Sequence, residues 1–187
     1  ILFDIEGIPS GITAQAPEMI PRIGVKLRLN KACENVRWHG KGPGESYPDS
    51  KESQLFGFYE NNIDGLFTNY VKPQENGSRS SCSWTRLLND RGMGLMVYSQ
   101  DKFDFSARFF EDSDLEYAGH TPDLKKRDYI TLNIDYKQNG LGSNSCGQSQ
   151  MEKYKCRFEK FRLSLKISLY NNKEINDLDL AGEKIIF

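Results

Sequence analysis

Strict alternation of apolar and polar residues is the pattern that most limits how this chain can fold. Between 161 and 169 every odd position is apolar, and the even positions are Arg162, Ser164, Lys166 and Ser168. The same period of two runs through 23–29, 103–109 and 129–135. Successive side chains of a strand point to opposite faces, so each stretch predicts a half-buried strand with one apolar face and one wet face.

Shorter apolar stretches predict further strands, at 1–5, 36–38, 54–60, 66–71, 82–85 and 94–98. Turn signals separate them. The segment from Gly40 to Gly44 is predicted to be a loop because it combines three glycines with Pro43. Asn76-Gly77 is predicted to be a turn. Short strands with frequent turns and almost no helical period predict an all-β fold, a large antiparallel β-sandwich.

One short helix is expected near Ser113. Ser113 and Glu116 have the spacing of a capping box, in which the serine caps the first turn and the glutamate reaches back. Gly119 and Pro122 follow closely and should end the helix.

Size and charge exclude several classes of protein. The 187 residues suffice for one domain with a real core. The 25 basic and 26 acidic residues nearly balance and form no basic stripe, which argues against nucleic acid and against a membrane surface. No apolar run approaches the roughly 20 residues that span a bilayer.

The cysteines and histidines form no recognisable metal motif. There is no CxxC pair, and no zinc-like spacing with His39 or His120. We therefore expect no cofactor in this chain, reduced thiols and a cytoplasmic location. The cysteines are Cys33, Cys82, Cys146 and Cys156.

A glycine-rich loop at 136–147 follows the predicted strand at 129–135. Gly140, Gly142 and Gly147 allow a tight backbone, and the loop also carries Ser143, Asn144 and Ser145. A polar loop held by a sheet is a common way to place contacts at a site. A simple polar turn remains the alternative at this point.

Several segments in the same order resemble one family. They are 38–49, 70–79, 120–128, and 132–135 followed by 140–146. From about Pro21 to Tyr170 the chain resembles the C-terminal domain (small chain, domain 5) of glycoside hydrolase family 2 β-galactosidases. The resemblance implies a supersandwich, the large antiparallel sandwich also found in galactose mutarotases, of which this chain would be an N-terminally incomplete fragment. Residues 171–187 would be a tail or an added edge strand.

The resemblance also implies a division of labour. In the family two glutamates on a (β/α)₈ barrel hydrolyse terminal β-galactosides such as lactose, and Mg and Na ions bind to the other domains. A barrel needs roughly 250 residues, so the catalytic glutamates are not expected in this chain. The expected partners are the catalytic barrel domain or large subunit, a β-galactoside sugar, and further copies in an oligomer.

The family places two segments of this domain at the mouth of the active site. In the glycine-rich loop the resemblance assigns substrate contact to Asn144, Ser145 and Cys146. Cys146 occupies a position where bacterial members have a tryptophan that stacks on sugar, and a cysteine cannot stack. The second segment contributes Glu75 and Asn76, as mouth residues or merely as a turn. Glu45 and Tyr47 match positions that orient a loop.

Two other functions remain open from the sequence. One is a non-catalytic carbohydrate-binding module, against which stands the loss of the stacking tryptophan. The other is a mutarotase-like epimerase, which needs an acid/base pair that commonly includes a histidine. His39 and His120 lie in no matching motif, and we expect both to serve packing or hydrogen bonding. Trp38 and Trp84 are expected to fill the core or an interface.

Overall fold

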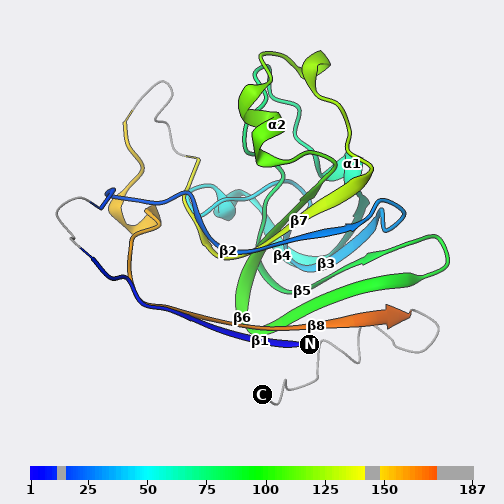
Figure 1. Cartoon of the computed structure of the whole chain (residues 1–187), viewed down its shortest axis with the longest axis horizontal. Coiled ribbons are helices and arrows are strands. Elements are labelled where there is room, and N and C mark those ends of the chain that lie inside the picture. Colours follow the sequence, from blue (N-terminus) through cyan, green and yellow to red (C-terminus); the bar gives the residue numbers. More distant parts are fainter. Residues whose placement is uncertain (12–15, 142–147, 172–187) are drawn as a thin grey trace.

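A computed structural model of the chain describes residues 1–11, 16–141 and 148–171 (Figure 1). Within these ranges the fold is one antiparallel sheet with short helices. The strands are β1 (Leu2–Gly7), β2 (Arg22–Asn30), β3 (Asn35–Gly42), β4 (Leu55–Asn62), β5 (Arg79–Leu88), β6 (Met93–Arg108), β7 (Tyr129–Gln138) and β8 (Phe161–Asn171). The α-helices are α1 (Ile63–Leu66) and α2 (Asp112–Tyr117), and the 3₁₀ helices are Lys51–Ser53, Thr121–Asp123 and Glu152–Tyr154.

The sheet divides at β6, which joins the predicted strands at 94–98 and 103–109 into one. The first half of β6 pairs with β8, and the second half pairs with β7. β1 pairs with β8, and β2 pairs with β7. The two pairs form two leaves of the sheet that diverge from β6, as Figure 1 shows. On the other side of β6 the sheet continues through β5 and β3 to β4. The predicted all-β, antiparallel, sandwich-like fold is confirmed.

The main core lies on the faces that the alternation marked as apolar. Trp38 of β3 is fully buried and meets Phe105 of β6 edge to face, with ring centroids 6.0 Å apart. Leu165 of β8 and Ile134 of β7 belong to the same cluster. A second cluster contains Trp84, Leu88, Met96, Tyr98 and Tyr170. Trp38 and Trp84 were predicted to fill the core or an interface, and both lie in core clusters.

The predicted loop at Gly40–Gly44 is wrong in its first part, because β3 continues to Gly42 and the chain leaves the strand only at Pro43 and Gly44. Gly40 pairs with Gly57 of β4, and a Cβ at Gly40 would lie only 2.4 Å from the Cys82 sulfur. The glycine therefore allows close packing inside a strand and does not mark a turn. The strand ends where Pro43 lacks the amide for a further ladder bond.

The predicted strand at 66–71 is also wrong. Leu66 is the last residue of α1, and its side chain and that of Ile63 are buried. Asn62 caps this helix, since its side chain accepts a hydrogen bond of 2.8 Å from the Gly65 amide. The cap starts a helical turn where the apolar residues alone suggested a strand.

The predicted short helix exists as α2 but is capped differently. Glu111 precedes the first turn, and its amide donates to the Asp114 side chain at 2.9 Å. The Ser113–Glu116 box is therefore wrong, because the helix begins before Ser113. No helix in the described part of the chain is long and apolar enough to cross a membrane. Cys33, Cys82 and Cys156 are free thiols, as predicted, and Cys146 lies outside the described residues.

Candidate functional site

The polar faces of β6 and β7 are buried, which corrects the prediction of a wet face. Asn133 and Asp135 of β7 are each 1% exposed, and Arg108 of β6 is 2% exposed. They are covered because the segment around Glu75 and the start of α2 fold over them. Thr131 and Ser106 lie on the same faces and are also buried.

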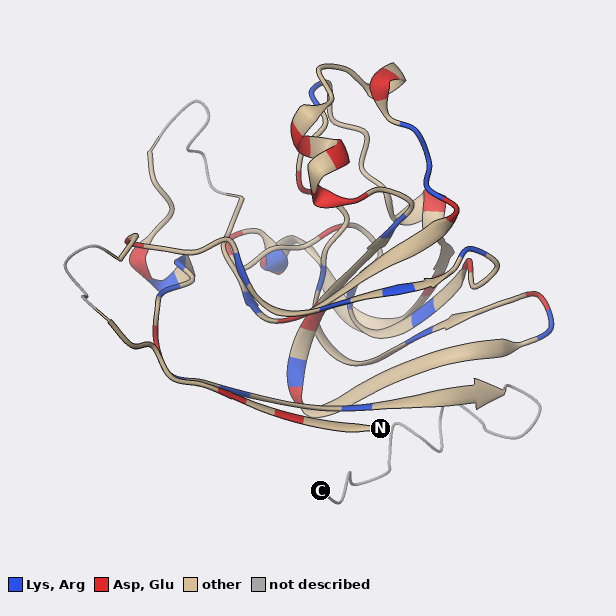
Figure 2. Ribbon diagram, viewed as in Figure 1, with Lys and Arg blue, Asp and Glu red and all other residues tan. Residues whose placement is uncertain are grey.

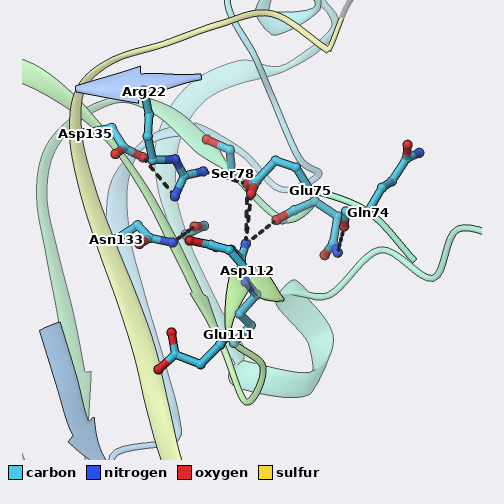
Figure 3. A network of polar contacts seen from close by, with 12 residues as sticks. Arg22, Gln74, Glu75, Ser78, Glu111, Asp112, Asn133 and Asp135 are labelled. Atoms are coloured by element: carbon cyan, nitrogen blue, oxygen red, sulfur yellow. Dashed lines mark hydrogen bonds and ion pairs between the residues drawn. The ribbon is translucent and has the colours of Figure 1, made fainter. Parts of the chain in front are cut away.

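Five charged side chains form what we call the ionic network: Arg22, Glu75, Arg108, Asp112 and Asp135. Figure 3 shows the labelled members converging from different segments. Arg108 donates through Nη1 to Glu75 Oε2 at 3.3 Å and to the Asn76 carbonyl at 3.4 Å, and it also binds Asp112. Arg22 Nη2 lies 2.9 Å from Glu75 Oε1, and Arg22 Nη1 lies 3.8 Å from Asp135 Oδ2. Two arginines therefore join the ends of β2, β6 and β7 to the 74–77 loop and to α2.

The backbone places the Asp135 side chain. The register of β2 and β7 shifts between Ile23 and Gly24, so that Tyr136 is an extra residue on β7. Such a bulge re-aims neighbouring side chains. A Cβ on Gly24 would lie 2.5 Å from Asp135 Oδ1 and 2.4 Å from the Ile134 carbonyl oxygen. Only glycine at this position leaves room for the carboxylate.

Burial dominates the electrostatics of the site. It raises the pKa of Asp135 to about 7, although the positive charge of Arg22 opposes the shift. The pKa of Asp104, which pairs with Asp135 across the strands, rises to about 6 for the same reason, opposed by the Ser81 amide hydrogen bond. Burial also acts to raise the pKa of Asp112, but a hydrogen bond from Lys26 and the charge of Arg108 outweigh it and lower the pKa.

Several buried polar atoms at the site have no hydrogen-bond partner among the described residues. Both oxygens of Asp135 belong to this group, as does Nη1 of Arg22. Buried polar groups are nearly always hydrogen-bonded, so each exception calls for an explanation. The others nearby are Ser78 Oγ, Arg108 Nε and Thr131 Oγ1.

Of the predicted mouth residues, the structure describes Glu75 and Asn76. Glu75 belongs to the ionic network and keeps 27% of its side chain exposed. Asn76 is 2% exposed, and its side chain accepts from the Thr68 amide at 3.1 Å and donates to the Gln74 carbonyl at 2.9 Å. Asn76 therefore stabilises the turn, in which Gly77 adopts a positive φ of 78°.

Glu45 and Tyr47 orient this turn, as predicted. Glu45 accepts a hydrogen bond of 2.8 Å from the Gly77 amide and a second one from the Tyr70 hydroxyl. The Tyr47 hydroxyl donates to Glu75 and accepts from the Ser78 amide, both at 3.4 Å. Burial holds the pKa of Tyr47 well above its usual value, so the hydroxyl keeps the proton it donates.

Asn144, Ser145 and Cys146 lie outside the described residues, but the residues that flank them lie beside the ionic network. The Asn139 amide donates to the carbonyl of Pro21 at 2.8 Å, and Arg22 is the next residue. The Asn139 side chain accepts from Gln150 at 2.8 Å and from the Cys156 amide at 3.1 Å. Asn139 thus joins the two described ends of the glycine-rich loop.

The histidines lie elsewhere. His39 stacks on Phe58, with ring centroids 4.3 Å apart, and lies 3.3 Å from the Ser83 hydroxyl. His120 precedes a 3₁₀ turn, and its amide donates to Asp123 at 2.9 Å. These contacts involve no member of the ionic network. Neither histidine is therefore seen to form, with a carboxylate of the network, the acid/base pair that an epimerase needs.

Sequence reasoning named Glu75 but missed the other four members of the network. Arg22, Arg108 and Asp135 occupy the polar positions of alternating strands, where charged residues ordinarily face water. The one available signal was Gly24 in the middle of a predicted strand, since such a glycine often marks a bulge or a close approach.

An all-β chain of 187 residues is too short for a (β/α)₈ barrel, and its ionic network joins loops to strand ends. The described residues form an antiparallel β-domain and not a (β/α)₈ barrel.

The particular family follows from comparison with known proteins. The chain belongs to the β-galactosidase small chain family, whose model matches residues 4–167. It is 35% identical over 144 residues to a β-galactosidase of Actinobacillus pleuropneumoniae, which is 77% of this chain and 14% of that protein. It is 30% identical over 152 residues to a β-galactosidase of Kluyveromyces lactis, covering 81% of this chain and 15% of the relative. The chain therefore spans about one seventh of the length of these relatives.

Proposed function

We propose that this chain acts as the C-terminal accessory domain of a β-galactosidase and forms a wall of the active-site mouth. The match to the small chain family over residues 4–167 carries the proposal. In it, two glutamates on a barrel outside this chain hydrolyse terminal β-galactosides such as lactose. The relatives' length supports this division, because most of each relative lies outside the matched region.

The ionic network supports the role in the mouth. Family resemblance assigns Glu75 and the glycine-rich loop to the mouth, and the two segments are far apart in sequence. Arg22 binds Glu75, while its neighbour Pro21 accepts from Asn139 at the start of the loop. A pair of adjacent residues thus ties both segments together, as a shared substrate surface requires.

The remaining parts of the proposal concern partners. The catalytic barrel domain or large subunit would bind this domain, and the complete enzyme would be an oligomer that works in the cytoplasm on a β-galactoside sugar. Mg and Na ions would bind to the other domains. Asn144, Ser145, Cys146, Glu75 and Asn76 would line the entrance for the sugar, with Asn76 acting through the turn it stabilises.

The replacement Cys146→Trp in the complete enzyme tests the position of the loop. A tryptophan there would give the sugar an aromatic face, worth roughly 0.5 kcal/mol at a wet entrance. We expect binding of glucose or lactose to tighten by about two- to threefold, with the chemical step unchanged. The measurement is the dissociation constant for each sugar.

Leu169→Trp is the matched control, because Leu169 is 88% exposed on β8, in the other leaf of the sheet. It should leave both dissociation constants unchanged. Equal affinities in wild type and a folded Cys146→Trp enzyme would show that the loop does not face the sugar.

A further inference from the structure

Arg22 and Asp135 face each other in the ionic network without a hydrogen bond. Their nearest charged atoms are 3.8 Å apart, beyond hydrogen-bond distance. The Asp135 side chain is 2% exposed, and neither of its oxygens has a hydrogen-bond partner in the described parts of the chain. Arg22 Nη1 is likewise buried and without such a partner. A donor and an acceptor are thus left facing the same place.

The backbone keeps the carboxylate in this position. The bulge at Tyr136 turns Asp135 toward Arg22, and Gly24 leaves the space that its Oδ1 occupies. A side chain without these constraints could rotate to find a partner or water. The bulge and the glycine meet at one point of the β2–β7 ladder, and together they hold Asp135 where no other described residue offers it a hydrogen bond.

The surrounding charges limit what can satisfy both groups. A cation would meet Arg22 and Arg108, and an anion would meet Asp135 and Glu75. A hydroxyl group avoids both conflicts, because its hydrogen can go to a carboxylate while its oxygen accepts from a guanidinium. We propose that Arg22 and Asp135 form a binding site for one hydroxyl group, which donates to Asp135 and accepts from Arg22 Nη1.

The hydroxyl can come from water or from a sugar. The sugar source rests on the proposed function, whereas the water source does not. The side chains of Arg22 and Glu75 are 19% and 27% exposed, so the network reaches the surface beside Asp135. The Asp135 oxygens and Arg22 Nη1 are themselves buried, so a sugar hydroxyl reaches them only when the side chains of Arg22 and Glu75 move aside.

Crystals of the full chain, grown alone and soaked in D-galactose, test the site directly. We expect density for one oxygen within about 3 Å of both Arg22 Nη1 and an Asp135 oxygen. A single water in both crystals assigns the hydroxyl to water, and a sugar ring in the soaked crystal assigns it to galactose. Absence of density between the two groups in both crystals would overturn the proposal. None of these outcomes depends on galactosidase activity.

The replacement Asp135→Asn separates the two sources in solution. If galactose supplies the hydroxyl, its dissociation constant should rise about three- to tenfold, because the asparagine oxygen still accepts but carries no charge to strengthen the hydrogen bond. Ser106→Ala, which removes a buried hydroxyl bonded to Asn133 on the same face, should leave that constant unchanged. Equal binding by wild type and Asp135→Asn assigns the hydroxyl to water, provided the crystals show the bridging oxygen. Should Asp135→Asn fail to fold, the wild-type crystals still decide.

Discussion

The two faces of β6 and β7 are equally buried but are held in opposite ways. Phe105 and Ile134 point into the apolar core, while Arg108 and Asp135 on the reverse faces join the ionic network. Figure 2 shows charged residues over several loops as well as strands, so charge alone does not mark this buried face. Apolar burial is favourable wherever volumes fit, whereas buried charge stabilises only in one geometry. The apolar face therefore supplies stability, and the polar face fixes the positions of loops.

The largest effect should come from the apolar face. Phe105→Ala removes a fully buried ring packed against Trp38, and we expect it to lower the free energy of unfolding by about 3–5 kcal/mol. Urea denaturation of the chain measures the change. Phe58→Ala is the control, because that ring is 45% exposed on β4, and it should cost much less. Equal losses for both would show that Phe105 does not belong to a close-packed core.

Removing one member of an ion pair on the polar face should lower the free energy of unfolding nearly as much. Breaking a buried ion pair costs about 3–5 kcal/mol. Arg108→Met removes the buried cation that Glu75 and Asp112 share, while Glu75 keeps Arg22 and Asp112 keeps Lys26. Water reaches both carboxylates in part, so we expect about 3 kcal/mol. The exposed pair of Lys126 and Asp64 gives the comparison: Lys126→Met should cost less than about 1 kcal/mol.

A double replacement sharpens this result. Arg108→Met combined with Glu75→Gln should cost less than the sum of the two single changes, because each single change already removes the contact between Arg108 and Glu75. Strict additivity in urea denaturation would mean that the two residues do not interact, contrary to the 3.3 Å contact.

The polar face should also make stability depend on pH through Asp104. Burial raises its pKa from 3.8 to about 6. The folded state therefore keeps a proton that the unfolded state releases, and the free energy of unfolding falls as pH rises from about 4 to about 6. The shift of about two units corresponds to about 3 kcal/mol.

Asp104→Asn removes this proton exchange and keeps an oxygen to accept from the Ser81 amide, which Asp104 does at 2.8 Å. The difference in unfolding free energy between wild type and variant should therefore move by about 3 kcal/mol in favour of the variant between pH 4 and pH 7. Asp64→Asn, at an exposed position on α1, is the control. A difference that stays constant with pH would contradict a buried, protonated Asp104.

The strands were predictable because alternation of apolar and polar residues depends only on neighbours in the sequence, as in Phe161–Leu169 of β8. The buried polar face was not, because segments around Glu75 and Asp112, distant in the chain, cover it. The same charged residues would look identical on an open surface. Gly40 was misread for a related reason: its role depends on Cys82 in a neighbouring strand. At the site, Glu75 was named from family resemblance and the structure adds its partners, while the roles of Asn144, Ser145 and Cys146 stay predictions.

Turnover of a chromogenic β-galactoside by the highly purified chain tests the central claim most directly. An accessory domain without the catalytic glutamates should show no turnover alone, and activity should appear only when the remaining part of the β-galactosidase is supplied. Turnover that co-purifies with the isolated chain, and that disappears when one of its own Asp or Glu residues is replaced, would contradict the account.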